Sequence, residues 1–249
     1  FWLKMLQTLK GHGVSRSLVH GGRELGKRCL RHRDVLPPRC CSSTSSAQPD
    51  LLWVPGAKAA DDAMANFLGK MGVCSQHEKM IVLGARGRIC GARAMRALAQ
   101  GSEALKIPYQ FCVRWTQDAG DERSLRFYAQ RTSTWTELKQ RWGPYVAPGM
   151  GSARVATPHS NVHKLATSLA IEERRFGRAS LKIDFGNEEV LYAAAKALAT
   201  LPNMVNSKYG SRGERLQCVL RMTEGRKFIY AMVWDPNLPA HAPEDEAPS

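Results

Sequence analysis

The stretch Ile81-Val-Leu-Gly-Ala-Arg-Gly-Arg-Ile-Cys-Gly-Ala-Arg-Ala-Met-Arg96 decides the fold. It begins inside a continuous apolar run, Lys79–Gly84, which predicts a buried strand. A glycine-flanked loop follows, and the apolar periodicity after it predicts a helix over Ile89–Ala99. A buried strand that passes through a tight loop directly into a helix indicates a fold with both α and β elements in one layered unit.

The flanking sequence predicts two further elements before this stretch and two after it. Alternating and helical periodicities predict a strand, a helix and then two strands, over Leu51–Val54, Ala59–Met71, Tyr109–Trp115 and Arg123–Arg131. The resulting order is β-α-β-α-β-β. We therefore expect an α+β sandwich, in which two helices cover one face of a four-stranded mixed sheet and the last two strands form a hairpin.

The second half of the chain repeats this order. Its predicted strands and helices are Ala153–Thr157, Asn161–Phe176, Ala179–Phe185, Glu188–Leu201, Arg215–Met222 and Lys227–Trp234. Two successive units with one element order predict tandem copies of a single domain, over residues 51–131 and 152–235. The linker between them, residues 132–151, contains a predicted short polar helix with Trp135 and Trp142, followed by a Pro/Gly-rich hinge.

The charge of the 249-residue chain, formally +14, is unevenly spread. Residues 1–50 hold nine basic and three acidic residues and many serines, which is typical of a mitochondrial presequence; the alternative is a basic tail that binds nucleic acid. Residues 236–249 form an acidic, Pro-rich tail.

A hydrophobic content of 43% excludes wholesale disorder. No apolar run approaches the roughly 20 residues of a membrane span, so we expect no membrane insertion.

The loop after the first buried strand is the candidate phosphate site. Gly84 and Gly87 allow a sharp turn and a close approach to a ligand, while Arg86 and Arg88 supply guanidiniums beside a helix N-terminus. The basic strip continues along the predicted helix at Arg93 and Arg96. The alternative for such arginines is solvated surface.

Nucleotide-binding loops of the common kinds do not fit this stretch. No Gly-Lys-Ser/Thr follows the glycines, which excludes a Walker loop, and the spacing of Gly84, Gly87 and Gly91 is not that of a dinucleotide-binding fingerprint.

The element order and the run Val82–Arg96 resemble the Alba superfamily of small DNA- and RNA-binding domains, related in layout to the sporulation stage V protein S. The resemblance implies nucleic-acid contacts through three segments: the loop after the first strand, where Lys58 alone is basic, the Arg86–Arg88 loop and helix, and the basic hairpin. The implied binding residues are Lys58, Gly84, Arg86, Gly87, Arg88, Arg93, Arg96, Arg114, Arg123 and Arg126.

Alba domains pair, so the resemblance further implies that the two copies form a pseudo-dimer within the chain. The equivalent loop of the second copy reads Phe185-Gly186-Asn187-Glu188-Glu189, where acids replace the arginines. These carboxylates would repel a phosphate. We therefore expect the second copy to be degenerate and to serve as a structural partner.

Enzymatic function is not indicated, and we expect no cofactor and no metal. His159 and His163 are four residues apart, but no nearby ligand completes a site, and Cys74 with His77 lacks an orienting acid. Seven scattered cysteines without a C-x-x-C pair favour a reducing compartment.

The leading hypothesis is a non-enzymatic RNA-binding protein of the mitochondrial matrix, with DNA as the alternative ligand. It would act alone or as a subunit of a ribonucleoprotein such as the mitochondrial ribosome, with protein partners there. The alternatives are a scaffold or assembly subunit of an organellar complex that binds no nucleic acid, a plastid protein, or a nuclear Alba-like chromatin or RNA protein.

Overall fold

The computed structural model describes residues 51–59, 61–75, 80–118, 123–131, 136, 153–209, 212–223 and 225–237, all within one compact unit, residues 42–249. The predicted leader, nearly all of the predicted linker with its helix, and most of the predicted tail lie outside these residues.

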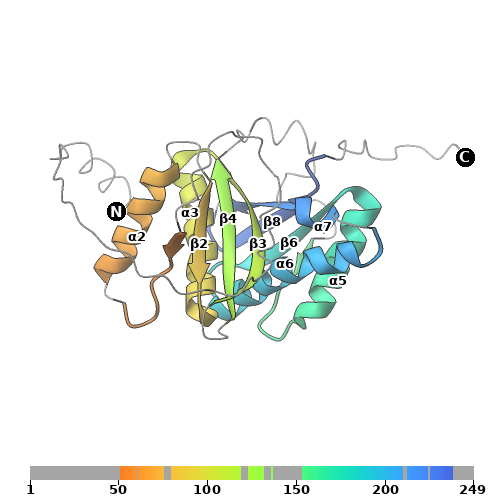
Figure 1. Ribbon diagram of the computed structural model, residues 1–249, viewed down its shortest axis with the longest axis horizontal. Helices are drawn as coiled ribbons and strands as arrows, with labels where there is room; N and C mark the ends of the chain where they lie inside the picture. Colours follow the sequence, from red (N-terminus) through yellow and green to blue (C-terminus); the bar gives the residue numbers. More distant parts are fainter. Residues whose placement is uncertain are drawn as a thin grey trace, which may run out of the picture. The chain divides into compact units, whose positions relative to one another are not determined.

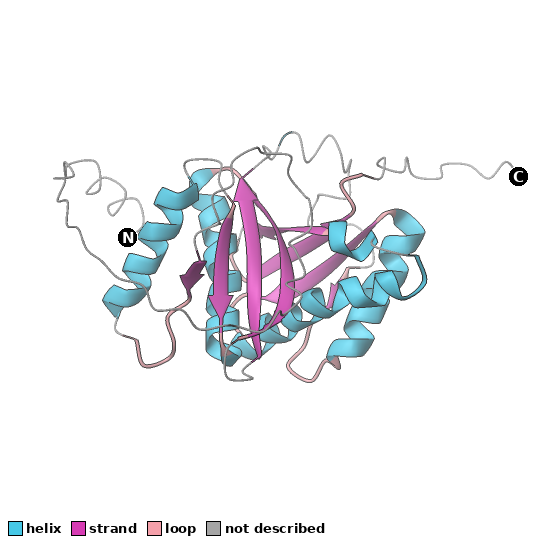
Figure 2. Ribbon diagram, in the orientation of Figure 1, coloured by secondary structure: helices cyan, strands magenta, loops and turns pink. Residues whose placement is uncertain are grey.

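The described strands form a single eight-stranded mixed sheet (Figures 1 and 2). The strands are β1 (Leu51–Trp53), β2 (Ile81–Ala85), β3 (Tyr109–Gln117), β4 (Arg123–Arg131), β5 (Arg154–Val155), β6 (Arg178–Asp184), β7 (Gln217–Met222) and β8 (Phe228–Trp234). The helices of the same residues are α2 (Asp61–Ser75), α3 (Gly87–Leu105), α5 (Val162–Phe176), α6 (Glu188–Tyr209) and the short α7 (Arg212–Arg215). The mixed α+β class predicted from the sequence is confirmed.

The strand order shows how the two halves of the chain combine. The sheet runs β1-β2-β4-β3-β7-β8-β6-β5, so each half contributes four strands in the same internal arrangement. The halves join where β3 and β7 pair antiparallel, with Gln110 opposite Val219 and Phe111 opposite Cys218. The sequence predicted a four-stranded sheet for each half, and in the structure these strands join into one continuous sheet.

The central helices cover one face of this sheet and make its core common to both halves. Because alternate residues of a strand face opposite sides, Leu83, Phe111 and Phe127 all point toward helix α3, and each is fully buried. Helix α3 also contacts β7 of the second half, and α6 contacts β3 of the first. One hydrophobic cluster therefore runs through both halves.

Three helices extend beyond their predicted ends, and the first of them, α2, runs past Met71 to Ser75. Helix α3 continues past Ala99 through Gly101, where an added Cβ would lie 2.9 Å from both Met71 and Tyr109, so the glycine permits close packing. Helix α6 was expected to end at Leu201, before Pro202, but it continues to Tyr209. Burial of Leu201 and Val205 on either side of Pro202 outweighs the backbone hydrogen bond that the proline removes.

In the described part of the chain, no helix has the length and apolar character needed to cross a bilayer.

Candidate nucleic-acid interface

The topology brings several of the predicted binding segments to one end of the first half of the sheet. Strands β1 and β2 are parallel, so the loops that follow them leave the sheet at the same end. Strand β4 runs antiparallel to β2 and β3, so the tip of the β3–β4 hairpin lies at this end too. Lys58, Arg86 and Arg123 are exposed on these three segments.

An aromatic ring from the edge strand β1 lies at this end of the sheet, on the face opposite helix α3. Register places Trp53 beside Gly84, and Gly84 beside Arg126. The guanidiniums of Arg86 and Arg126 lie over the Trp53 indole, 4.4 and 4.5 Å from the ring centroid. A Cβ on Gly84 would lie 2.8 Å from Cε3 of Trp53, so the missing side chain makes room for the ring. Gly84 thus makes space for the Trp53 ring, while Gly87, at a φ of +74°, provides the backbone turn.

Asp118 holds both guanidiniums in place. Its carboxylate accepts from Nη2 of Arg126 at 2.5 Å and from Nε of Arg86 at 3.3 Å, and only 8% of its side chain is exposed. Burial acts to raise the pKa of Asp118, but hydrogen bonds from Arg126 and Ser124, the Arg126 charge and Arg86 together hold that pKa below its ordinary value. We name Trp53, Arg86, Arg126 and Asp118 the Trp53 cluster.

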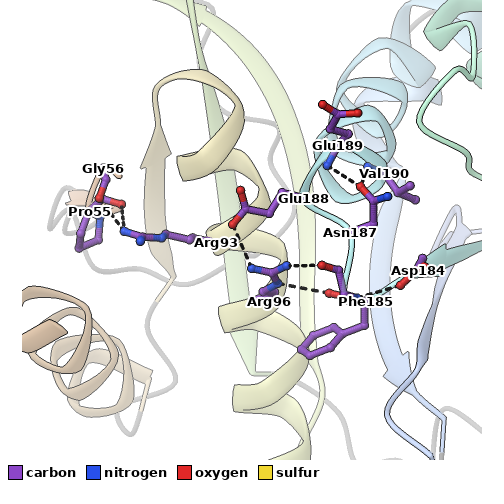
Figure 3. Close-up of polar contacts among 11 residues, drawn as sticks. Pro55, Gly56, Arg93, Arg96, Asp184, Phe185, Asn187, Glu188, Glu189 and Val190 are labelled. Carbon is purple, nitrogen blue, oxygen red and sulfur yellow. Dashed lines mark hydrogen bonds and ion pairs between the residues drawn. The ribbon is translucent and has the colours of Figure 1, made fainter. Parts of the chain in front are cut away.

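Arg93 and Arg96, predicted to extend the basic strip, bind the protein's own backbone (Figure 3). Nη1 of Arg93 donates to the carbonyl oxygens of Pro55 and Gly56 at 2.9 and 2.6 Å, which ties the loop after β1 to α3. The Arg96 guanidinium donates to the carbonyl oxygens of Phe185 and Gly186 and to the Glu188 carboxylate, at 3.2, 3.0 and 3.2 Å. The principal contacts of both side chains are therefore intramolecular.

The acids of the second half meet the arginines of the first. Nη1 of Arg88 donates to Oε1 of Glu189 at 2.6 Å, with both side chains more than half exposed. Arg88 and Glu189 are the second residues of α3 and α6. The fifth residues of the two helices, Gly91 and Tyr192, are also in contact, because a Cβ on Gly91 would lie 2.7 Å from the Tyr192 ring. The two helices thus cross at equivalent positions. The acidic loop of the second half complements the basic helix of the first.

The three arginines of the predicted basic hairpin have different surroundings. Arg114 donates to the carbonyl oxygens of Glu214 and Gly213 at 2.8 and 3.4 Å, and so contacts the second half beside α7. Arg126 belongs to the Trp53 cluster, with 14% of its side chain exposed. Arg123, the first residue of β4, is exposed.

Sequence reasoning missed Trp53 and Asp118. A tryptophan that pairs with a glycine on the neighbouring strand can place its ring over the glycine backbone. This pairing cannot be recognised from the sequence until the strand register is known. Asp118 directly follows strand β3 at the start of the hairpin connection, and an acid among arginines at such a position is the signal for an ion pair.

The described residues also contain side chains of metal-binding types and cysteine thiols. Among the described residues, no cluster of three or more His, Cys, Asp or Glu could hold a metal. Cys90, Cys112 and Cys218 are buried and form no disulfide, and burial raises the pKa of Cys218 well above its usual range, so its thiolate is suppressed.

Comparison with known proteins finds no matching family model, no matching curated protein and no matching solved structure. The Alba resemblance accordingly stays an expectation from the sequence.

Proposed function

We propose that this chain is a non-enzymatic RNA-binding protein built from two Alba-like units that pair within the chain, the second unit being degenerate. The shared strand order of the halves and their junction at β3–β7 support the pairing. The observation that carries the binding proposal is the cationic end of the first half, where three segments present exposed Lys58, Arg86 and Arg123.

We propose a smaller set of RNA-binding residues than the sequence predicted, on the basis of the intramolecular contacts. Arg93, Arg96 and Arg114 donate to the protein's own carbonyl oxygens, so we assign them to its architecture. Arg88 stays in the binding set, because its ion pair with Glu189 is exposed. Exposed pairs contribute about 0–1 kcal/mol, so a phosphate can replace the carboxylate. RNA would be held by phosphate contacts, with weak sequence preference.

Charge reversal at two exposed positions tests this proposal. Lys58→Glu with Arg123→Glu should weaken binding of a mixed-sequence RNA, measured by fluorescence anisotropy across a salt series. The slope of log affinity against log salt should become shallower by about 0.7 for each lost phosphate contact on single-stranded RNA. The matched control is Lys106→Glu with Lys164→Glu, which reverses two exposed charges at other places in the fold. Equal effects from the two double variants would contradict the assigned surface.

A second candidate function is a scaffold subunit that keeps the fold without binding nucleic acid. Three of the predicted binding arginines, Arg93, Arg96 and Arg114, donate hydrogen bonds within the protein, which favours this alternative. Arg96 and Arg114 connect the two halves of the chain. Wild-type protein with no salt-dependent RNA affinity would establish this alternative.

We place the protein in the mitochondrial matrix, in a ribonucleoprotein such as the mitochondrial ribosome, on the composition of residues 1–50. Crosslinking and sequencing of bound RNA from purified mitochondria tests both parts. A uniform ribosomal footprint supports a particle subunit, scattered messenger tags indicate a free regulator, and absence from the organelle overturns the placement.

A further inference from the structure

We propose that the Trp53 cluster stacks on an unpaired nucleobase through the guanidiniums that lie over its ring, so that the first half of the protein prefers single-stranded over double-stranded RNA. This inference rests on the proposed RNA-binding function and adds to it the class of RNA. Phosphate contacts alone would bind either form.

The position of Trp53 fits a stacking surface. The side chain is 41% exposed, although it lies on a sheet whose other face carries the core. Gly84 leaves room for the ring against the backbone, and the Arg86 and Arg126 guanidiniums lie over it, so the cluster presents a layered aromatic and planar cationic surface. Each of the three segments with exposed cations leaves the sheet at the same end as Trp53. A strand whose phosphates contact those cations would therefore pass its bases close to the ring.

The two arginines of the Trp53 cluster prepare this surface. Asp118 fixes both guanidiniums over the ring, so binding would not have to order these long side chains. Their planar groups add cation–π and stacking contacts to a base, and their charge favours the adjoining phosphates. Half of the Arg86 side chain is exposed, which allows it to contact the ligand while it remains on Asp118.

The preference for single-stranded RNA follows from which bases can reach the Trp53 cluster. Bases within a duplex are stacked and paired, and presenting one to Trp53 would require unstacking it. Bases in single strands and loops are available, and aromatic platforms bind them with little regard to sequence. A stacked base thus distinguishes the two forms of RNA without a base-specific hydrogen bond.

Trp115 provides a matched control for the test. It is 38% exposed and lies on strand β3 of the same half, but register with Leu125 places it on the helix-covered face. Trp53→Leu and Trp115→Leu remove equally exposed indoles from opposite faces. Gly84→Ala is a second variant, since it displaces the Trp53 ring without deleting it.

The experiment measures the affinity of each full-length variant for a single-stranded RNA and for a duplex of the same sequence. Trp53→Leu should weaken single-strand binding on the order of tenfold or more and leave duplex binding within about twofold. Gly84→Ala should shift in the same direction, and Trp115→Leu should change neither affinity. Circular dichroism melting confirms that each variant is folded, and the non-aromatic Trp53→Met replaces Trp53→Leu if the latter is unfolded.

Equal loss on both RNAs, or no loss on either, overturns the stacking assignment while leaving RNA binding intact. If wild-type protein binds neither RNA, the proposed function itself fails, and the two failures are therefore distinguishable.

Discussion

Asp118 shows how one carboxylate organises a surface made of cations. Two guanidiniums share it, and it is nearly buried, so its removal leaves Arg126 partly buried without its ion pair. Asp118→Asn should lower the free energy of unfolding at neutral pH by about 1–3 kcal/mol, the usual cost of losing a charged hydrogen-bond partner. Urea denaturation of the two proteins measures this difference.

The same substitution carries a pH signature. The pKa of Asp118 is lowered in the folded state, so its carboxylate stabilises the fold at any pH above the unfolded value of about 3.9. That contribution is lost as the pH falls through the lower, folded pKa. The gap between wild type and Asp118→Asn should therefore be full at pH 7 and shrink below about pH 4. A gap that stays constant down to acid pH would show that the ionised carboxylate is not responsible.

Residue type and spacing located the arginines but not their partners. The sequence indicated that Arg86, Arg93 and Arg96 follow a buried strand, yet Arg86 lies over an aromatic ring while Arg93 and Arg96 bind carbonyl oxygens. Those carbonyls come from segments 37 and 90 residues away, so no local pattern encodes the contact. Chain-distant partners of this kind decide whether an arginine is available to a ligand.

At the scale of elements, the contact between α3 and the loop before α6 depends unequally on its two arginines. Arg96 is 25% exposed and binds two carbonyl oxygens and Glu188, whereas the Arg88–Glu189 pair is exposed. Arg96→Ala should lower the free energy of unfolding by about 1–2 kcal/mol, because three acceptors, two of them partly buried, lose their donor. Arg88→Ala should cost under about 1 kcal/mol.

Thermal and urea denaturation of both variants measures this difference, and RNA affinity supplies the discriminating readout. Arg88→Ala should reduce affinity with little loss of stability, and Arg96→Ala should do the reverse. The opposite pattern would return Arg96 to the binding surface.

The helix crossing makes a separate prediction. Ala is ordinarily a better helix residue than Gly by about 1 kcal/mol, but a Cβ at Gly91 would lie 2.7 Å from the Tyr192 ring. Gly91→Ala should therefore destabilise the protein, by about 1–3 kcal/mol. Tyr192→Ala in the same chain should remove the clash and reverse the sign of the Gly91→Ala effect. A double-mutant cycle by denaturation measures the coupling, and additive effects would contradict the contact.

The elements themselves were largely predictable because their periodicities are local. Strand β4 has the predicted bounds and α5 differs by one residue, since the alternation of the strand and the apolar stripe of the helix are clear in the sequence. The ends of α3 and α6 were not predictable, because packing around Gly101 and Pro202 overrides the local preference of both residues. The short helix α7 was not predicted.

At the scale of the whole molecule, the sequence predicted two similar units but not how their sheets meet. At the junction, Gln110 pairs with Val219 and Phe111 pairs with Cys218. Residues of these types are common in any pair of interior strands. Nothing in such residues specifies a partner strand. What makes the junction specific lies instead in the helices above it, where α3 and α6 differ in charge and size at equivalent positions.

This complementarity predicts that unlike halves pair and like halves do not. Two copies of the first half, arranged as the natural halves are, would place Arg88 against Arg88 and leave a gap between two glycines at position 91. Two copies of the second half would bring Glu189 against Glu189 and Tyr192 against Tyr192. Like charges and mismatched volumes disfavour both arrangements, whereas the natural combination satisfies charge and packing together.

Separate chains covering residues 42–131 and 152–249 should therefore associate one to one when expressed together, and neither should form a stable dimer alone. Affinity copurification and sizing by analytical ultracentrifugation measure this. Exchanging the charges, with Arg88→Glu in one fragment and Glu189→Arg in the other, should preserve association, while either change alone should weaken it modestly because the pair is exposed. A first-half fragment that dimerises with itself as readily as with the second half would show that strand pairing, rather than the helix crossing, selects the partner.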